Sequence, residues 1–367
     1  MRGGAGIIKK CYIILLIVFI ITFVVSFEPE IFTTNNGFNK ENLYRAKIVE
    51  LQNITNNYKH KQLITAQFIG GPYSAKCISL SNELNGQPFE IKYKKGDLIF
   101  LGLAKEKSSS FFYIYGPIRD RWLLLLLLFF VASVVIIAGL QGIRAIISLG
   151  LVCFLVFKIL VPLMIQGYEP IIVTLVIAAL ATVLNLFLVS GFNAKTIAAI
   201  IGTLSGVITA TLLALIFGEL THLIGNSDES MQMLQYVAST HINCRGLLFS
   251  GIIIGALGAV MDIAMSISSA VIEIKDSNPK LGLCSLFTYG LKIGRDITGT
   301  MTNTLVLAYV GSSFPLLLLF NVYDTSLVHV LNMDQIAAEV IRMISGSIGL
   351  VVAIPLTAIT AAFLSLN

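Results

Sequence analysis

The sequence predicts an α-helical polytopic membrane protein of about eight transmembrane helices, with a small extracytoplasmic β-barrel-like domain between the first and second spans. Three observations predict this fold. Of the 367 residues, 56% are hydrophobic and only 12% are charged, whereas soluble domains carry roughly 25% charged residues. The mean hydropathy is +0.86. Polar residues are concentrated between Glu28 and Arg121, and apolar runs of about 20 residues, the length that a bilayer requires, recur outside that stretch.

The chain begins with a basic segment followed by an apolar one. Arg2, Lys9 and Lys10 precede an apolar run at residues 12–27. This order is typical of a signal peptide or a signal anchor. The run ends in VVSFEPE, without a small-x-small cleavage site. We therefore expect residues 1–27 to form an uncleaved anchor helix whose N-terminus lies inside.

Residues 28–118 form the only soluble portion of any size. Short β-branched stretches such as QLITAQFI and DLIFLGLA are separated by turn signals such as GGPY and KKGD. This pattern predicts a β-barrel of five or six strands, of the OB or SH3 kind. The aromatic run FFYIYG and the segment RDRW then follow, and such residues are typical of a membrane interface.

Residues 119–367 are expected to form a seven-helix membrane domain. With the N-terminus inside, the cytoplasmic loops receive most basic residues and the short outer loops most acidic ones, with Arg245 and Arg342 as exceptions. This bias predicts a multi-pass protein with both termini inside and residues 28–118 outside. We place the seven spans at residues 122–140, 144–166, 169–190, 195–218, 246–272, 297–321 and 339–364.

Several function classes lack the residues that they need. The five cysteines form no C-x-x-C pair and the four histidines no H-E-x-x-H pair, so neither a metal site nor a redox motif is expected. A phosphate-binding G-x-x-x-x-G-K-[ST] loop is missing, which argues against a nucleotide-driven pump. No nucleophile-and-base or metal arrangement indicates an enzyme or a cofactor. The net charge of +5 comes from basic residues beside apolar runs and gives no case for nucleic acid.

One carboxylate, Asp262, stands near the middle of an apolar span. A charge at that depth costs about 2.5–3.5 kcal/mol on insertion scales. The carboxylate must find a donor or a cation, or remain protonated, so we interpret it as functional. A close helix–helix contact, of which GIIIG is a typical site, explains the nearby glycines but does not explain Asp262. Steps of three or four place one stripe on a single helical face: Gly251, Gly255, Gly258, Asp262, Ser266, Ser269 and Glu273.

The next span is unusually polar. Seven of the ten residues from Arg295 to Thr304 are polar, so we expect Asp262 to face this span, with Thr302 or Asn303 within hydrogen-bond reach. Gly294 and Gly299 are candidate helix breaks, a construction common in transporters. The alternative is that the threonines bond back to the i−4 carbonyl and that the basic residue anchors the span inside. The polar residues are Arg295, Asp296, Thr298, Thr300, Thr302, Asn303 and Thr304.

Two weaker signals have ordinary explanations. Lys158 lies near the middle of its span, where it either pairs with Asp262 or extends its ammonium group to the interface. Asn185 and the small residues between Gly202 and Thr209 are interpreted as helix-packing contacts.

Two segments resemble the signature of the YibE/F family of bacterial membrane proteins: GAVMDIAMSISSAVIEI and KIGRDITGTMTNTLVLAYVG. The resemblance covers residues 40–365, and Lys158 is not part of the pattern. The family is defined by sequence and has no established biochemical function. The resemblance therefore implies the topology and the bacterial cytoplasmic membrane, but no substrate. It draws attention to Asp262, Arg295, Asp296 and Asn303.

The leading hypothesis is a transporter or permease in which Asp262 is the titratable or ion-binding group. Its partners would be the lipid bilayer and an ion or small-molecule substrate. The alternative is a scaffold or sensor that transports nothing, in which the outer β-domain binds an envelope ligand. Neither substrate nor oligomeric state follows from the sequence. The remaining predicted site residues are Ser266 and Ser269 on the stripe, Arg295 and Asp296 as charged partners, and Thr298, Thr302 and Asn303 as polar lining.

Overall fold

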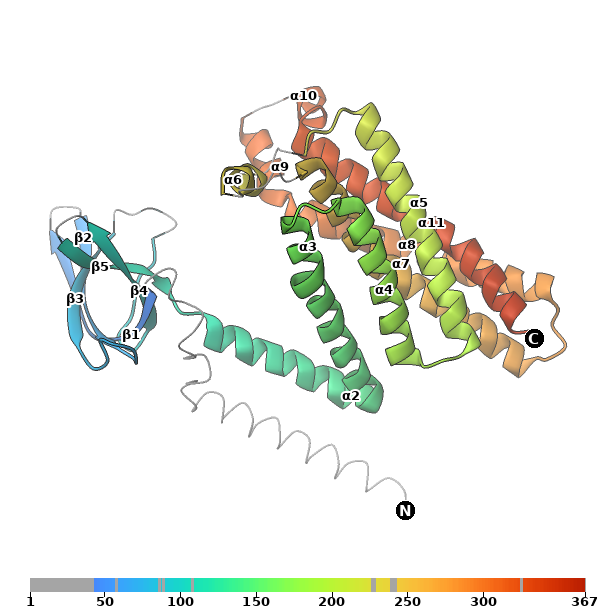
Figure 1. The fold of residues 1–367 in the computed structure, drawn as a ribbon, viewed down its shortest axis with the longest axis horizontal. Coiled ribbons are helices and arrows are strands. Elements are labelled where there is room, and N and C mark those ends of the chain that lie inside the picture. The colour runs from blue at the N-terminus through green and yellow to red at the C-terminus, as the bar shows by residue number, and fades with distance from the viewer. Residues whose placement is uncertain are drawn as a thin grey trace, which may run out of the picture. The chain divides into compact units, whose positions relative to one another are not determined.

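The computed structural model describes residues 43–56, 59–84, 87, 90–106, 109–225, 229–237, 243–323 and 326–366. The chain divides into two compact units, residues 1–139 and 140–367. The first unit holds a curved β-sheet and the second a helical bundle (Figure 1). The anchor helix predicted at residues 1–27 lies outside the described residues.

The sheet has five strands in the order β3-β2-β1-β4-β5, and all neighbouring pairs are antiparallel. The long strand β1 pairs with both β2 and β4, and its register with β2 shifts between Ile48 and Glu50. Such a bulge bends a strand, and the two edge strands β3 and β5 come into contact. The result is a half-barrel. The strands are β1 Leu43–Asn56, β2 Lys59–Phe68, β3 Cys77–Leu84, β4 Leu98–Glu106 and β5 Ser109–Pro117.

Alternation along the strands builds the core of the half-barrel. On β2, Gln62, Ile64, Ala66 and Phe68 are buried, as the period of two along a strand requires. They pack with neighbours such as Ile99. The β-rich domain predicted from the alternating stretches is therefore present. Its five strands form a half-barrel sheet, which is a coarser description than an OB or SH3 fold.

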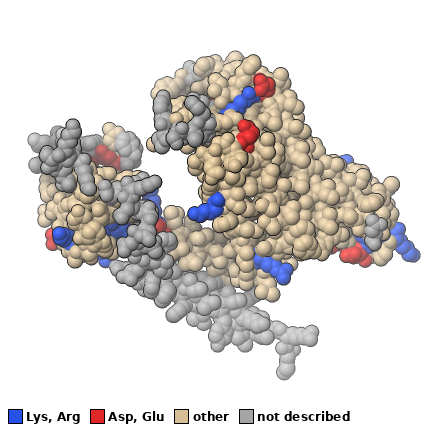
Figure 2. Space-filling view, in the orientation of Figure 1, with Lys and Arg blue, Asp and Glu red and all other residues tan. Residues whose placement is uncertain are grey.

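Helices make up the rest of the described chain. Their surface is largely uncharged on the face shown in Figure 2, with charged side chains in small separate patches. The helices are α2 Asp120–Phe154, the π-helical η2 Leu155–Leu160, α3 Val161–Ile165, α4 Pro170–Ser190, α5 Ala194–Leu220, α6 Glu229–Val237, α7 Cys244–Ser277, α8 Leu283–Ser312, α9 Phe314–Val322, α10 Leu327–Leu331 and α11 Asp334–Leu364.

Five helical segments in the described chain are long and apolar enough to cross a membrane: Asp120–Ile165, α4, α5, α7 and α11. A sixth arises if α8 and α9, bent by 59° where they meet, count as one span. Pro315 follows directly after this bend, and a proline cannot continue the hydrogen bonding of a preceding helix. These helices indicate a membrane protein.

The spans predicted at residues 122–140 and 144–166 both lie in the segment Asp120–Ile165, which consists of two helices joined across a kink, where Gly139 has a non-helical backbone (φ 58°). The structure differs from the prediction at α8. The break predicted at Gly294 or Gly299 does not form, because α8 continues through both. A side chain at Gly294 would overlap Ile354 of α11, so this glycine permits close packing instead.

The tightest contact in the bundle joins α5 to α11, which lie side by side (Figure 1). A Cβ at Gly202 would overlap the Thr357 side chain, and one at Gly206 would lie 2.7 Å from the carbonyl oxygen of Gly349. Small residues let two backbones approach this closely. The packing role predicted for the small residues of α5 is confirmed.

Gly206→Ala is expected to destabilise the bundle by about 1–3 kcal/mol, the usual cost of overpacking a close-packed core. The new methyl group would meet the Gly349 carbonyl oxygen and the Ala353 methyl group, which cannot rotate away, and a methyl group of Val260. Thermal unfolding of the purified protein measures the effect. Gly150→Ala on α2 is the matched control, because nothing lies within 4 Å of its added Cβ. Equal melting temperatures for the two variants would contradict this account of the α5–α11 contact.

Candidate functional site

The stripe predicted on α7 lies on one face of the helix, and from Gly258 onward this face is not packed against the bundle. Six of its seven residues are exposed, and Ser269 is half-buried. The opposite face carries Val260, Ile263 and Ile267, which are fully buried. Nothing of the described chain lies within 4 Å of a Cβ added at Gly258. Large apolar residues, rather than the stripe, therefore bind α7 to the bundle.

Helix α8 runs antiparallel to α7. A Cβ at Gly290 would lie 2.9 Å from Val271, and one at Gly294 would lie 3.2 Å from Ile267. At the other end of the contact, a Cβ at Gly255 would overlap the hydroxyl of Tyr309. Counting along both helices from these contacts, Asp262 lies level with residues 299–302 of α8.

The polar side chains of α8 continue this unpacked face. The helix buries Leu286, Gly290, Gly294 and Leu305 against its neighbours. The α7 stripe and the polar α8 residues named in the next sentence together form what is called the α7–α8 polar face. Its exposed α8 members are Arg295, Asp296, Gly299, Thr300, Asn303 and Thr304, while Thr298 and Thr302 are half-buried.

The hydrogen bond predicted between Asp262 and Thr302 or Asn303 is not formed. Within the described part of the chain, Asp262 has no hydrogen-bond or ion-pair partner, and it is exposed. Thr302 lines a groove with α11 residues such as Ser347, and its buried hydroxyl has no hydrogen-bond partner. Asp262 lies at about the level of Thr302 along the two helices, as the prediction requires, but Thr302 faces α11 rather than Asp262.

The ordinary interpretation holds for two threonines of α8. Thr298 donates to the carbonyl oxygen of Gly294 at 2.7 Å, and Thr304 donates to that of Thr300 at 2.9 Å. Among the described residues no ion pair joins Arg295 to Asp296, and none joins Lys158 to Asp262. The charged groups of the polar face are therefore not bound to one another within one chain.

A pocket of about 470 Å³ lies where α7, α8 and α11 meet, at the end of the bundle that holds the start of α11. Arg342 donates to Glu339 at 2.8 Å, with side chains that are only 22% and 27% exposed. The guanidinium carbon lies 5.8 Å from the centre of the Tyr309 ring. The other polar lining residues are Ser312, Ser313 and Gln335.

Sequence reasoning missed this pocket and registered Arg342 only as a basic residue on the acidic side. The available signal was the i, i+3 spacing of Glu339 and Arg342, which places opposite charges on one helix face. The α7 stripe begins beside it, because a Cβ at Gly251 would lie 3.8 Å from Nη2 of Arg342. From Gly251 to Asp262 the helix rises about 16 Å.

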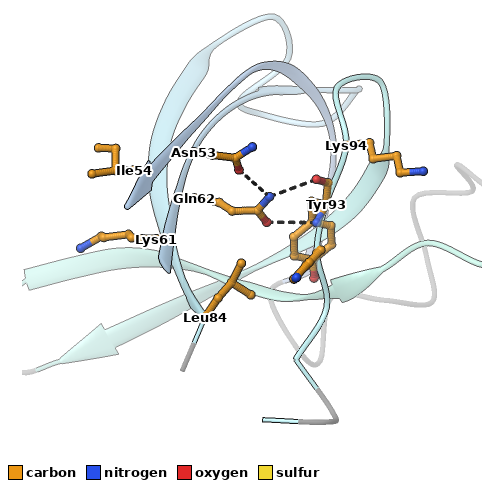
Figure 3. A pocket seen from close by; sticks show the side chains of 8 residues that line it. Asn53, Ile54, Lys61, Gln62, Leu84, Tyr93 and Lys94 are labelled. Atoms are coloured by element: carbon orange, nitrogen blue, oxygen red, sulfur yellow. Dashed lines mark hydrogen bonds between the residues drawn. The ribbon is translucent and has the colours of Figure 1, made fainter. Parts of the chain in front are cut away.

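A second pocket, of about 380 Å³, lies in the half-barrel (Figure 3). Gln62 donates to Asn53 Oδ1 at 3.0 Å and to the Tyr93 carbonyl oxygen at 3.2 Å, and accepts from the Tyr93 N–H at 3.0 Å. Burial raises the pKa of the Tyr93 phenol. The interior amide is thus satisfied by the chain itself. Three lysines complete the lining: Lys61, Lys92 and Lys94.

The described residues include no group of three His, Cys, Asp or Glu side chains that could hold a metal ion. Cys77, Cys153, Cys244 and Cys284 are free thiols.

At the level of Asp262, the α7–α8 polar face offers one carboxylate together with hydroxyl and amide groups. Such oxygens suit a proton or a hard cation.

A family model described as YibE/F-like protein matches residues 126–366. This range contains the whole α7–α8 polar face and the Arg342 pocket, and it excludes the half-barrel. Comparisons with curated proteins and with solved structures found no match.

Proposed function

The chain belongs to the YibE/F-like family, and from this premise we propose that it is a permease of the bacterial cytoplasmic membrane in which Asp262 takes up and releases a proton or a cation. The observation that carries the proposal is the state of this carboxylate. It stands near the middle of a candidate span and has no partner among the described residues. An ionisable group at such a depth is costly and is typically functional.

The surroundings of Asp262 leave room for a path along the α7–α8 polar face. Gly258 leaves open space beside it, and Ser266 continues the face toward the far end of α7. In the other direction the stripe leads to the Arg342 pocket. We assign this pocket as one entrance of the path. The proposal gives the chain no enzymatic activity and no cofactor.

The proposed topology has eight spans, with the first at residues 12–27. The segment Asp120–Ile165 has 46 residues, about 69 Å of helix, which is more than twice the ~30 Å hydrocarbon core. The backbone break at Gly139 divides it into two parts, each of about the length that one span requires. Counting α8 with α9 as one span then gives eight, with both termini inside.

The half-barrel is proposed to lie outside, close to the membrane surface. Strand β5 exposes Phe111, Tyr113 and Tyr115 on one face, and Trp122 at the start of α2 is also exposed. Aromatic side chains of this kind gather at membrane interfaces. Arg45 of β1 forms an ion pair of 2.7 Å with Asp120, the first residue of α2, which ties the sheet to the span.

Labelling of cysteines in intact cells tests this orientation. A membrane-impermeant thiol reagent is expected to label Cys77 in the half-barrel and to leave Cys284, in the first turn of α8, unlabelled. Both thiols are exposed, so a difference reports the side of the membrane rather than burial. Each is tested as the single cysteine of a full-length variant, and permeabilised cells supply the control in which both react. Labelling of Cys284 in intact cells, with Cys77 protected, would overturn the topology.

The alternative function is a scaffold or sensor whose outer domain binds an envelope ligand. The pocket of the half-barrel favours it, because Lys61, Lys92 and Lys94 line an accessible cavity. Three ammonium groups suit an anionic ligand. One of these lysines, Lys61, also forms an ion pair of 3.4 Å with Glu83.

Ion movement in proteoliposomes separates the two functions. The purified full-length protein is reconstituted, and proton, Na⁺ and K⁺ fluxes are followed under imposed gradients. The permease predicts protein-dependent movement of at least one ion that follows the pH gradient. A folded protein that moves no ion under any gradient, but whose half-barrel binds an acidic ligand, would leave the scaffold or sensor.

A further inference from the structure

The α7–α8 polar face lies on the outside of the packed bundle, in the part of the molecule that crosses the membrane. Lipid cannot hydrogen-bond to Asp262, Asp296 or Asn303, and unsatisfied polar groups in hydrocarbon cost several kcal/mol each. In the membrane this face must therefore meet water or another polar surface.

The two spans that belong to the first unit, residues 1–139, do not provide such a surface. Residues 12–27 contain no charged or amide side chain, only Tyr12, Thr22 and Ser26 as polar groups. In α2 before Gly139, the residues after Trp122 offer only Ser133, whose hydroxyl already donates to the Phe129 carbonyl oxygen at 2.8 Å. Neither segment can satisfy a carboxylate together with an arginine.

We propose that two copies of this chain meet in the membrane through the α7–α8 polar face, and that α8 of the second copy completes the site around Asp262. A two-fold axis along the membrane normal brings together residues of equal depth and makes the contact self-complementary. The cover is then supplied by the same hydroxyl, amide and charged groups that need covering.

The depths of the charged and polar residues match this arrangement. Asp262 lies level with residues 299–302, so the exposed Thr300 and the amide donor Asn303 of the second copy are at its depth. Glu273 lies two residues beyond Val271 and is therefore level with residue 288. Lys292 lies four residues, just over one helical turn, from that level, and both side chains are exposed. In the proposed dimer these opposite charges approach each other across the axis.

The glycines of the stripe give the contact its closeness. A Cβ at Gly258 would meet nothing of its own chain within 4 Å, so this glycine is not required for folding of one copy. A small residue at this position does allow the backbone of another helix to approach. These observations by themselves support the contact between two copies. The role of the second copy in ion binding also rests on the proposed function.

Cross-linking between single cysteines tests the contact. Gly258→Cys, in an otherwise cysteine-free full-length chain, is expected to form a disulfide-linked dimer in native membranes and after reconstitution of the purified chain alone. Val176→Cys is the matched control, because Val176 is exposed on α4, a helix that contributes no residue to the polar face. Equal cross-linking of the two variants would overturn the proposal. So would a Gly258→Cys chain that cross-links only to other proteins and is monomeric when purified.

A bulky residue supplies the second measurement. Gly258→Leu is expected to weaken self-association in lipid about tenfold, which corresponds to about 1.4 kcal/mol, because the bulky side chain overpacks a close helix contact. The melting temperature of the monomer in detergent should not change. Gly150→Leu, on an open helix surface, should leave association unchanged. Unaltered association of Gly258→Leu would overturn the interface.

The two proposals fail in different ways. A dimer that cross-links at residue 258 but moves no ion would remove the permease and keep the interface. Ion flux from a protein that stays monomeric in lipid would keep the permease and remove the interface.

Discussion

Asp262→Asn is expected to abolish gradient-driven ion movement while leaving the melting temperature close to that of the wild type. Asparagine keeps the shape of aspartate and still forms hydrogen bonds, but it cannot carry charge. Breaking a buried ion pair costs about 3–5 kcal/mol, because the remaining charge is left without a partner. In one copy of the chain, Asp262 has no partner among the described residues, so its neutralisation leaves no charge uncompensated.

The measurement combines thermal unfolding with flux in proteoliposomes for the wild type and the variant. Glu273→Gln is the matched control, because it removes a carboxylate from the same exposed stripe near the end of α7. It should retain most of the flux. A variant of Asp262 that melts far below the wild type, in a protein that moves no ion, would identify a structural carboxylate and favour the scaffold.

The periodicity of the sequence was sufficient to predict that the stripe residues share one face of α7, and the helical rise was sufficient to predict where along the helix Asp262 lies. Steps of three and four can only produce one stripe on a helix, and 1.5 Å per residue sets the depth. The rotation of α8 does not follow from its own sequence. It depends on Gly290 and Gly294, which fit against Ala358 and Ile354 of α11. This packing turns Thr302 away from Asp262.

Glycine had opposite meanings that sequence alone did not separate. Gly139 stands at the boundary between the spans predicted at residues 122–140 and 144–166, where it adopts a left-handed φ of 58° and interrupts α2. Gly294 lies among polar residues, yet it continues α8 and packs closely. The difference lies in the neighbouring helix. Only a tertiary contact decides whether a glycine interrupts its helix or lets a second helix pack closely against it.

The ion pair at the pocket gives the second large effect. Arg342→Met and Glu339→Gln are each expected to destabilise the protein by about 1–3 kcal/mol, the cost of leaving a largely buried polar group without its partner. The two atoms lie 2.8 Å apart, with limited exposure. Thermal unfolding of the purified variants measures both effects. The surface pair Lys61–Glu83, with side chains 41% and 66% exposed, is the control, because Lys61→Met should change stability by less than about 1 kcal/mol.

The double variant Arg342→Met with Glu339→Gln separates stability from transport. Replacing both charges removes the unpaired group, so most of the lost stability should return. If the pocket is the entrance to the path, flux should stay low although the protein is stable again, because the charges that attract an ion are gone. A double variant with both stability and flux restored would show that the ion pair only holds α11 in place. In that case the α7–α8 polar face would have to be entered from elsewhere.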